Sequence, residues 1–339
     1  MNDNVIEMFP AENLSFLSEM HLWGIEVIRA IQKIQNPALT SIVKFITALG
    51  TENLYLPLIL FIFWWIDEKQ GLRFGILIIV SAWINSFMKN LWKQPRPFHL
   101  DPSLGLAMET SYGAPSGHAQ MSLSFWIPMA AWLTGAGKGS ARRKYLIWGA
   151  SVFFILLIGF TRLYLGVHFP TDLFAGWIIG GVILAAFFLT GPRLEKFFDS
   201  ASTRTRSITA AAIALIMNGF LPREGSLAAL FLGFCLGYAL MKQRFPFHAR
   251  DDINGKKPGL NVMIFRCLTG FVGIAVIYLG LRLILPGEAS IFSGIPLWGE
   301  ASPIYELGRF IRYGFIGFWA SAGAPWLFRQ MGLASRENS

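Results

Sequence analysis

Residues 171–190 read TDLFAGWIIGGVILAAFFLT, a run in which Asp172 is the only charged side chain. A helix of about 20 apolar residues crosses the hydrocarbon core of a bilayer, which is about 30 Å thick. Such a run is too long and too apolar for an ordinary helix of a soluble domain, so it predicts a transmembrane helix. Similar runs recur along the chain, and together they decide the fold class.

The composition agrees with a membrane protein. Of the 339 residues, 54% are hydrophobic and 14% are charged, whereas about 25% of the residues of a soluble domain are charged. The net charge is +9, but the basic residues lie between the apolar runs. This placement favours contact with anionic lipid headgroups and excludes a nucleic-acid-binding protein. Cys235 and Cys267 lie inside apolar runs, without the spacing of a metal site or a disulfide framework.

The apolar runs predict an all-α, polytopic bundle of about nine transmembrane helices. Two of the runs, 206–222 and 226–241, are short for a membrane span. The nine predicted spans cover residues 53–66, 72–92, 116–136, 145–163, 171–190, 206–222, 226–241, 263–285 and 304–328.

The chain before the first span has a different pattern. Two amphipathic stretches, around 22–34 and 39–49, are separated by Asn36 and Pro37. Helices of this kind lie along the membrane interface more often than they cross it; the alternative is one additional, tilted span. We therefore expect three parts: an interfacial segment (1–52), a transmembrane core (53–190) and a four-span extension (206–328).

The connecting segments predict an orientation. Lys and Arg in short loops concentrate on the cytoplasmic side of a membrane, and here every second connection is rich in them, whereas 286–303 has none. This alternation places the amino-terminal segment outside and the carboxyl terminus inside. The basic residues of the inner set are Lys69, Arg73, Lys138, Arg142, Arg143, Lys144, Arg193, Lys196, Arg204, Arg206, Lys242, Arg244, Arg250, Lys256 and Lys257.

Three polar clusters fall on the opposite, non-cytoplasmic face. Taken alone, each has an ordinary explanation: a helix-end anchor, a helix cap, or a satisfied polar pair. Their convergence from five spans on one face favours a functional site, because ionisable groups at membrane depth are costly. The clusters are Lys89 with Arg96, then Pro115-Ser116-Gly117-His118, and then Arg162 with His168 and Asp172.

The residue types in these clusters indicate a site for phosphate. Lys89, Arg96 and Arg162 supply three cations, and a guanidinium group can bind phosphoryl oxygens with two hydrogen bonds. Backbone N–H groups near Ser116 and Gly117, at the start of a helix, favour an anion further. Two histidines and one carboxylate could also hold a metal ion, but three adjacent cations would repel it. We therefore expect no metal and no cofactor.

The two histidines suggest a division of the chemistry. Asp172 lies four residues after His168, near enough to accept the Nδ1 proton, which leaves Nε2 free to attack phosphorus. His118 is then available to protonate the leaving alkoxide and later to activate water. The predicted catalytic residues are His168, His118 and Asp172.

These motifs resemble those of the type 2 phosphatidic acid phosphatase (PAP2) superfamily, whose pattern is Lys-x6-Arg-Pro, Pro-Ser-Gly-His and Ser-Arg-x5-His-x3-Asp. This chain matches it at Lys89 to Pro97, Pro115 to His118, and Arg162 to Asp172, with Thr161 in place of the usual Ser. The resemblance covers roughly 53–190. It implies a helical core, a covalent phosphohistidine at His168, a general acid at His118 and no metal. Soluble vanadium haloperoxidases share the motifs, but the apolar spans argue against that branch.

The predicted activity is hydrolysis of a lipid phosphate or pyrophosphate, a phosphoric monoester or diphosphate, at the outer leaflet. A bacterial inner membrane with a periplasmic site is the expected location, and a lumenal site in the endoplasmic reticulum is the second choice. Two alternatives stay open: transfer of the phosphoryl group to another hydroxyl, and a lipid transporter or scramblase that kept the fold.

Arg309 and Arg312 lie in the carboxyl-terminal extension. They either belong to an internal ion-pair network or, as a sharper hypothesis, contact the substrate headgroup.

Overall fold

The structure is a computed structural model that describes residues 19–135, 139–221, 225–287, 289–292, 294–295, 298 and 304–335. Within these ranges every regular element is helical, which confirms the predicted all-α fold. The first 18 residues of the predicted interfacial segment lie outside the described ranges. The helices are α3 (Glu19–Gln32), α4 (Pro37–Ala48), α5 (Glu52–Phe61), η1 (Ile62–Ile66), α6 (Glu68–Trp92), α7 (Pro97–Leu100), η2 (Pro102–Leu104), α8 (Gly117–Thr134), α9 (Ala141–Tyr164), α10 (Pro170–Ser200), α11 (Thr203–Phe220), α12 (Gly225–Arg244), α13 (Leu260–Ile284), α14 (Tyr305–Phe318), η4 (Trp319–Gly323) and α15 (Ala324–Gln330).

Helical structure is present at each of the nine predicted spans, but the count of nine crossings is not confirmed. Five helices are long and apolar enough to cross a membrane, and a sixth span results if α4 and the following α5–η1 helix, bent by 45°, are one broken span. α8 falls short because polar residues such as His118 and Gln120 occupy its first turns. The protein is therefore an integral, multi-pass membrane protein.

The chain forms two compact units. The first comprises residues 1–55 and 84–189, and the second comprises 56–83 and 190–339. This division differs from the predicted ranges, since 56–83 joins the carboxyl-terminal helices instead of the predicted core. The functional boundaries at 52, 190 and 206 stay a prediction. All eight predicted site residues lie in the first unit.

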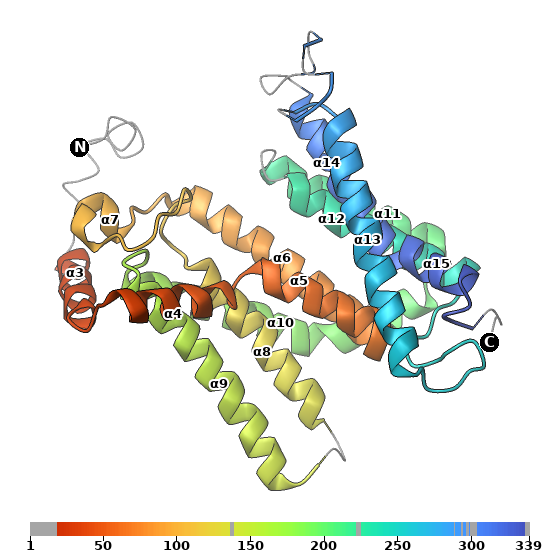
Figure 1. The fold of residues 1–339 in the computed structure, drawn as a ribbon, viewed down its shortest axis with the longest axis horizontal. Helices are drawn as coiled ribbons and strands as arrows, with labels where there is room; N and C mark the ends of the chain where they lie inside the picture. Colours follow the sequence, from red (N-terminus) through yellow and green to blue (C-terminus); the bar gives the residue numbers. More distant parts are fainter. Residues whose placement is uncertain are drawn as a thin grey trace. The chain divides into compact units, whose positions relative to one another are not determined.

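In the first unit, α8 packs along α9, and α3 and α4 pack on α9 as well (Figure 1). Asn36 separates α3 from α4 and caps α4, its Oδ1 accepting the Leu39 N–H at 2.9 Å. The end of α9 is tied to both helices: the Gln32 side-chain amide donates to the Tyr164 carbonyl at 2.9 Å, and the Tyr164 hydroxyl lies 3.0 Å from Thr40 Oγ1. The predicted interfacial helices are therefore part of the unit that contains the site.

The second unit is organised around Arg266 of α13, whose side chain is completely buried. Its guanidinium group donates to four backbone carbonyls, those of Trp64, Ala249, Asp251 and Leu333. A buried charge is tolerated only when its donors are satisfied, and here carbonyl oxygens fill that role. Arg266 thus joins η1, the loop after α12 and the chain after α15 in one hydrogen-bonded network.

α12 and α14 of the second unit approach each other at glycines. A Cβ atom at Gly233 would overlap the Gly314 carbonyl group, so only glycine permits this close packing. On α14, Arg309 forms an ion pair with Glu306 at 3.4 Å, and Arg312 lies over the rings of Tyr278 and Tyr313. The ion pair agrees with the internal-network interpretation for Arg309, whereas Arg312 contacts aromatic rings instead of a carboxylate. The headgroup hypothesis stays untested.

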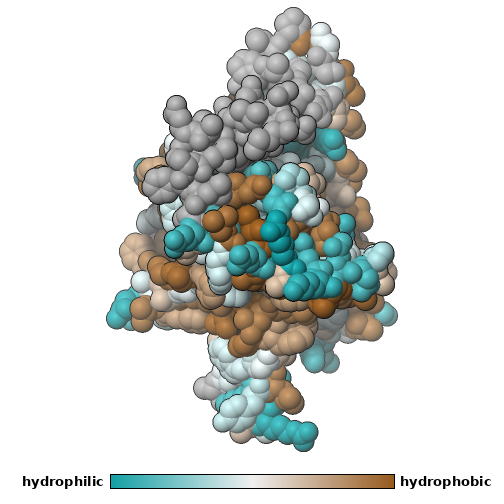
Figure 2. Space-filling view, turned by 90° about the vertical axis from the view of Figure 1, so that its left-hand side faces the viewer, coloured by the Kyte–Doolittle hydropathy of each residue, from teal (hydrophilic) through white to brown (hydrophobic). Residues whose placement is uncertain are grey.

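Helices of both units expose apolar side chains at regular intervals. On α10, Phe174, Ile178 and Val182 are each more than half exposed, and on α13 so are Val272 and Val276. Spacings of four residues place such side chains on one helix face. Such a stripe is unfavourable in water and suits contact with lipid chains. Figure 2 shows hydrophilic side chains gathered beside hydrophobic surface on the face toward the viewer.

Candidate active site

Lys89 and Arg96 reach the site from the end of α6 and the segment that follows it. The Lys89 ammonium group donates to the Tyr112 carbonyl at 2.6 Å and to Ser111 Oγ at 3.1 Å. Arg96 is 1% exposed and donates through Nε to the Ser111 carbonyl at 2.6 Å and through Nη2 to Ser111 Oγ at 3.0 Å. Two of the predicted phosphate-binding cations thus hold the same short stretch of backbone before α8.

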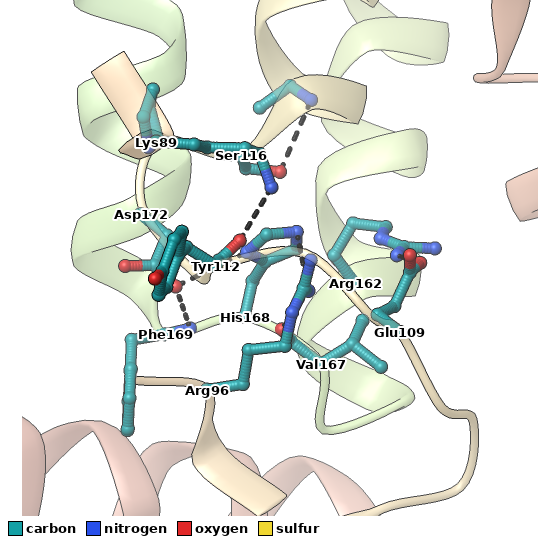
Figure 3. Close-up of polar contacts among 12 residues, drawn as sticks. Lys89, Arg96, Glu109, Tyr112, Ser116, Arg162, Val167, His168, Phe169 and Asp172 are labelled. Carbon is teal, nitrogen blue, oxygen red and sulfur yellow. Dashed lines mark hydrogen bonds and ion pairs between the residues drawn. The ribbon is translucent and has the colours of Figure 1, made fainter. Parts of the chain in front are cut away.

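Arg96 also contacts the predicted nucleophile (Figure 3). Its Nη1 donates to the Val167 carbonyl at 2.8 Å and lies 3.3 Å from Nε2 of His168. A guanidinium group has donors and no acceptor, so Nε2 must accept in this contact. The imidazole proton is therefore on Nδ1, which is the tautomer that nucleophilic attack by Nε2 requires.

Asp172 holds the other side of the His168 ring. Its Oδ2 lies 3.3 Å from Nδ1 and also accepts the Phe169 N–H at 2.9 Å. His168 lies between α9 and α10, and burial lowers the pKa of its imidazole well below the usual value, with the charge of Arg96 lowering it further. The ring is therefore neutral without substrate, which is the state of a nucleophile.

Arg162 completes the set of cations from the last turn of α9. Its side chain is 3% exposed. Nη1 donates to Thr47 Oγ1 of α4 at 2.8 Å, and Nη2 forms an ion pair with the Glu109 carboxylate. Nε is buried and has no hydrogen-bond partner in the described parts of the chain. Arg162 therefore keeps a free donor next to an ion pair.

The Pro115–His118 turn forms the start of α8, and Ser116 caps the helix, which is the ordinary explanation that this motif allowed. One detail differs from the prediction of free N–H groups near Ser116 and Gly117. The Ser116 N–H donates to the Asp172 carbonyl at 2.9 Å, so it is not free to bind an anion. Within the described residues, the N–H groups of Gly117 and His118 have no partner, and they remain available.

Asn85 and Gly50, which are outside the predicted set, lie next to this turn. Asn85 of α6 donates to the Pro115 carbonyl at 3.3 Å and to Gln120 Oε1 at 2.9 Å. A Cβ atom at Gly117 would lie 3.1 Å from Asn85 Oδ1, so the lack of a side chain at Gly117 permits this packing. The His118 ring lies close to Gly50, whose Cβ position would be 3.2 Å from His118 Cδ2.

The structure thus brings together all eight residues that the sequence singled out, from α6, the segment after it, α8, α9 and α10. The contacts of Ser111, Tyr112 and Glu109 could not be predicted, because these residues lie in an irregular connection without a periodic pattern. Within the described ranges, no group of three or more His, Cys, Asp or Glu side chains is arranged to hold a metal ion. Three cations, two imidazoles and free N–H groups instead suit a phosphoryl group.

Comparison with known families decides the assignment. The PAP2 superfamily model matches residues 70–196, and a second model, the transmembrane extension of PAP2 superfamily phosphatases, matches residues 225–336. This chain belongs to the PAP2 superfamily. The two matches include nearly all of α6, then α7 to most of α10, and α12 to α15, so the predicted class of PAP2-type phosphatase is confirmed.

Curated relatives of this PAP2 protein are phosphatases by name. Phosphatidylglycerophosphatase B of Bacillus subtilis is 28% identical over 53% of this chain and 85% of its own length. Undecaprenyl-diphosphatase of Sulfolobus acidocaldarius is 26% identical over 48% of this chain and 75% of its own. Sphingosine-1-phosphate phosphatase 2 of Mus musculus is 25% identical over 86% of this chain and 87% of its own, so that similarity includes the carboxyl-terminal helices.

Proposed function

We propose that this protein hydrolyses a lipid phosphate or pyrophosphate through a phosphohistidine formed at His168, without a metal ion. The observation that carries the proposal is the pair of contacts at the imidazole: Arg96 Nη1 at 3.3 Å from Nε2, and Asp172 Oδ2 at 3.3 Å from Nδ1. These contacts support the proposal, because a nucleophilic Nε2 needs a cation beside it for the phosphoryl oxygens and a carboxylate on the opposite side of the ring.

In the first step, Arg96 exchanges its contact with His168 for one with a phosphoryl oxygen. The Nε2 lone pair forms a bond to phosphorus as the bond from phosphorus to the lipid oxygen breaks. His118, protonated at this stage, donates its proton to that oxygen, and the lipid alcohol leaves. From a pyrophosphate, the bond that breaks is the one to the bridging oxygen, and the lipid monophosphate leaves. Lys89, Arg96 and Arg162 stabilise the charge on the equatorial oxygens, and Asp172 stabilises the charged imidazole.

In the second step, water attacks the phosphohistidine. His118, now neutral, accepts a proton from the water as its oxygen bonds to phosphorus and the bond to Nε2 breaks. Inorganic phosphate is released and the starting protonation state is restored. An acceptor hydroxyl in place of water would make the protein a phosphotransferase.

Membrane lipids are the proposed substrates for two reasons. The relatives named above act, by name, on lipid phosphates or diphosphates. In this chain the site is formed at the ends of helices that expose apolar faces, such as α10, so a lipid could present its headgroup while its chains stay in the bilayer. The distribution of Lys and Arg favours the outer leaflet. In a bacterial inner membrane, which is the proposed location, this is the periplasmic side.

A substrate panel tests the proposal. Purified protein in detergent or vesicles would be given phosphatidic acid, phosphatidylglycerophosphate, a polyprenyl pyrophosphate and a sphingoid phosphate, and released phosphate would be measured. We expect release from at least one of them. No release from any, combined with lipid movement between leaflets, would favour a transporter or scramblase; transfer to an added alcohol would favour a phosphotransferase.

Asp172→Asn should lower kcat by about 10²- to 10⁴-fold, because the amide cannot stabilise the charged imidazole or hold the same tautomer. The nearly isosteric side chain can still accept the Phe169 N–H, so the fold should persist. Steady-state kinetics on the best substrate, with a melting curve, would check this. Asp101→Asn, which alters a carboxylate paired with Arg29 instead, is the control. Equal kcat for Asp172→Asn and wild type would remove Asp172 from the mechanism.

EDTA should leave the activity of the wild-type protein unchanged, since three side-chain cations perform the charge stabilisation that a metal ion would supply. Phosphate release would be measured before and after prolonged incubation with the chelator, and again after adding Mg²⁺. Loss of most of the activity, restored by the metal, would contradict the metal-independent mechanism.

A further inference from the structure

The connection between η2 and α8 supplies partners for all three proposed phosphate-binding cations. Ser111 accepts from Arg96 and Lys89, Tyr112 accepts from Lys89, and Glu109 pairs with Arg162. Without substrate, oxygen atoms of this connection therefore occupy donors that a phosphoryl group would use. The contacts with Ser111 and Tyr112 involve neutral oxygens, whereas the contact with Glu109 is ionic.

The Arg162–Glu109 pair is asymmetric in its exposure to water. The Arg162 side chain is 3% exposed, but that of Glu109 is 32% exposed. Within the described ranges, this is the one ion pair that joins any of the three cations to a carboxylate. Arg162 is thus held at the site by burial and by Thr47, while the Glu109 carboxylate can return to water at low cost. Figure 3 shows the two side chains beside each other.

The backbone around Glu109 is fixed at both ends and open between them. On one side the Leu106 N–H donates to the Leu165 carbonyl at 3.0 Å, and on the other the Gly113 N–H donates to the Gln94 carbonyl at 2.8 Å. A Cβ atom at Gly113 would lie 2.5 Å from the Pro95 carbonyl oxygen, so that end has no room to shift. Met108, next to Glu109, is 79% exposed. A turn of the Glu109 side chain therefore needs no rearrangement of the connection.

We propose that Glu109 is a displaceable counter-ion, which occupies Arg162 in the empty site and competes with the phosphoryl group for it. This inference rests on the proposed function, because it takes Arg162 as a ligand of the phosphoryl group. When a phosphoryl group enters, Arg162 turns its donors to the phosphoryl oxygens and Glu109 moves to water. After hydrolysis Glu109 reclaims Arg162 and helps inorganic phosphate to leave, so it is a residue that sets affinity for substrate and product.

Inhibition by inorganic phosphate tests this proposal. Glu109→Gln keeps the size of the side chain and removes its charge, so the inhibition constant for phosphate should fall by about fivefold or more, and KM should fall with it. A residue that only held Arg162 in position would have the opposite effect, since its loss would weaken phosphate binding. Glu109→Ala is the second variant and should shift the inhibition constant in the same direction.

Glu26→Gln is the matched control: Glu26 is an exposed carboxylate of α3 in the same unit, and it should leave the inhibition constant within about twofold of wild type. An unchanged or higher inhibition constant in both Glu109 variants would overturn the inference while leaving the proposed function intact. A different pair of results would contradict the proposed function alone. In that case the wild-type protein releases no phosphate from any lipid, but Glu109→Gln binds inorganic phosphate more tightly than wild type does.

Discussion

We expect His168→Ala to abolish turnover, with kcat falling by about 10⁴-fold or more, because the covalent route is lost. His168 is 1% exposed, and both ring nitrogens have partners, so no other side chain can take the same position. Phosphate release over hours, measured with the best substrate of the panel, would check the loss. Residual activity within tenfold of wild type would show that another group attacks phosphorus.

His168→Asn separates the loss of chemistry from damage to the fold. The smaller amide is polar and can still receive a hydrogen bond from Arg96, so the cations should keep their arrangement. We expect this variant to be inactive yet to bind inorganic phosphate with an affinity within about threefold of wild type. If it also fails to bind phosphate and melts at a much lower temperature, the inactivity of the alanine variant is structural.

Arg96→Lys should lower kcat/KM by about 10²- to 10³-fold. Lysine keeps the charge, but one ammonium group cannot contact Ser111, Val167 and the phosphoryl oxygens at once. Arg96 uses three nitrogens for these contacts. The variant would be compared with wild type by kcat/KM and by melting temperature.

Arg29→Lys is the control for Arg96→Lys, because Arg29 pairs with Asp101 and is largely exposed. It should leave kcat/KM within about twofold, as expected for an exposed ion pair. If Arg96→Lys is as active as Arg29→Lys, a positive charge alone suffices at this position. The proposal that the Arg96 guanidinium group binds the phosphoryl group through two hydrogen bonds would then be wrong.

The sequence predicted the helices well, because membrane spans depend on local composition. Each apolar run forms a helix, and the turn at Ser116 begins α8 as its Pro-Ser-Gly pattern suggested. The number of crossings was harder to predict, since α8 and α11 contain polar residues that lower their hydropathy. The grouping of 56–83 with the carboxyl-terminal helices depends on contacts between distant residues, such as Trp64 Nε1 with the Ala320 carbonyl at 2.8 Å.

Seven of the eight predicted site residues could be found because they are charged or polar and lie near the ends of apolar runs, and Gly117 because it lies in the turn beside Ser116. Their partners could not. Thr47 lies in a helix predicted to be interfacial, and Glu109 lies in an irregular connection, yet both contact Arg162. Arg266 lies inside the predicted span 263–285, and nothing in that run predicts its burial among backbone carbonyls of the second unit. The local sequence pattern around a site residue does not predict which residues of remote segments will contact it.

The phosphohistidine at His168 can be detected by trapping the covalent intermediate. Wild-type protein would be mixed with a lipid labelled in its phosphate group, quenched in alkali within one turnover, and digested for mass spectrometry. Phosphohistidine is a phosphoramidate that survives alkali and is lost in acid. We predict an acid-labile phosphate on the peptide containing His168, absent from His168→Asn. Turnover of the same lipid with no labelled peptide, or with the label on another residue, would contradict the mechanism.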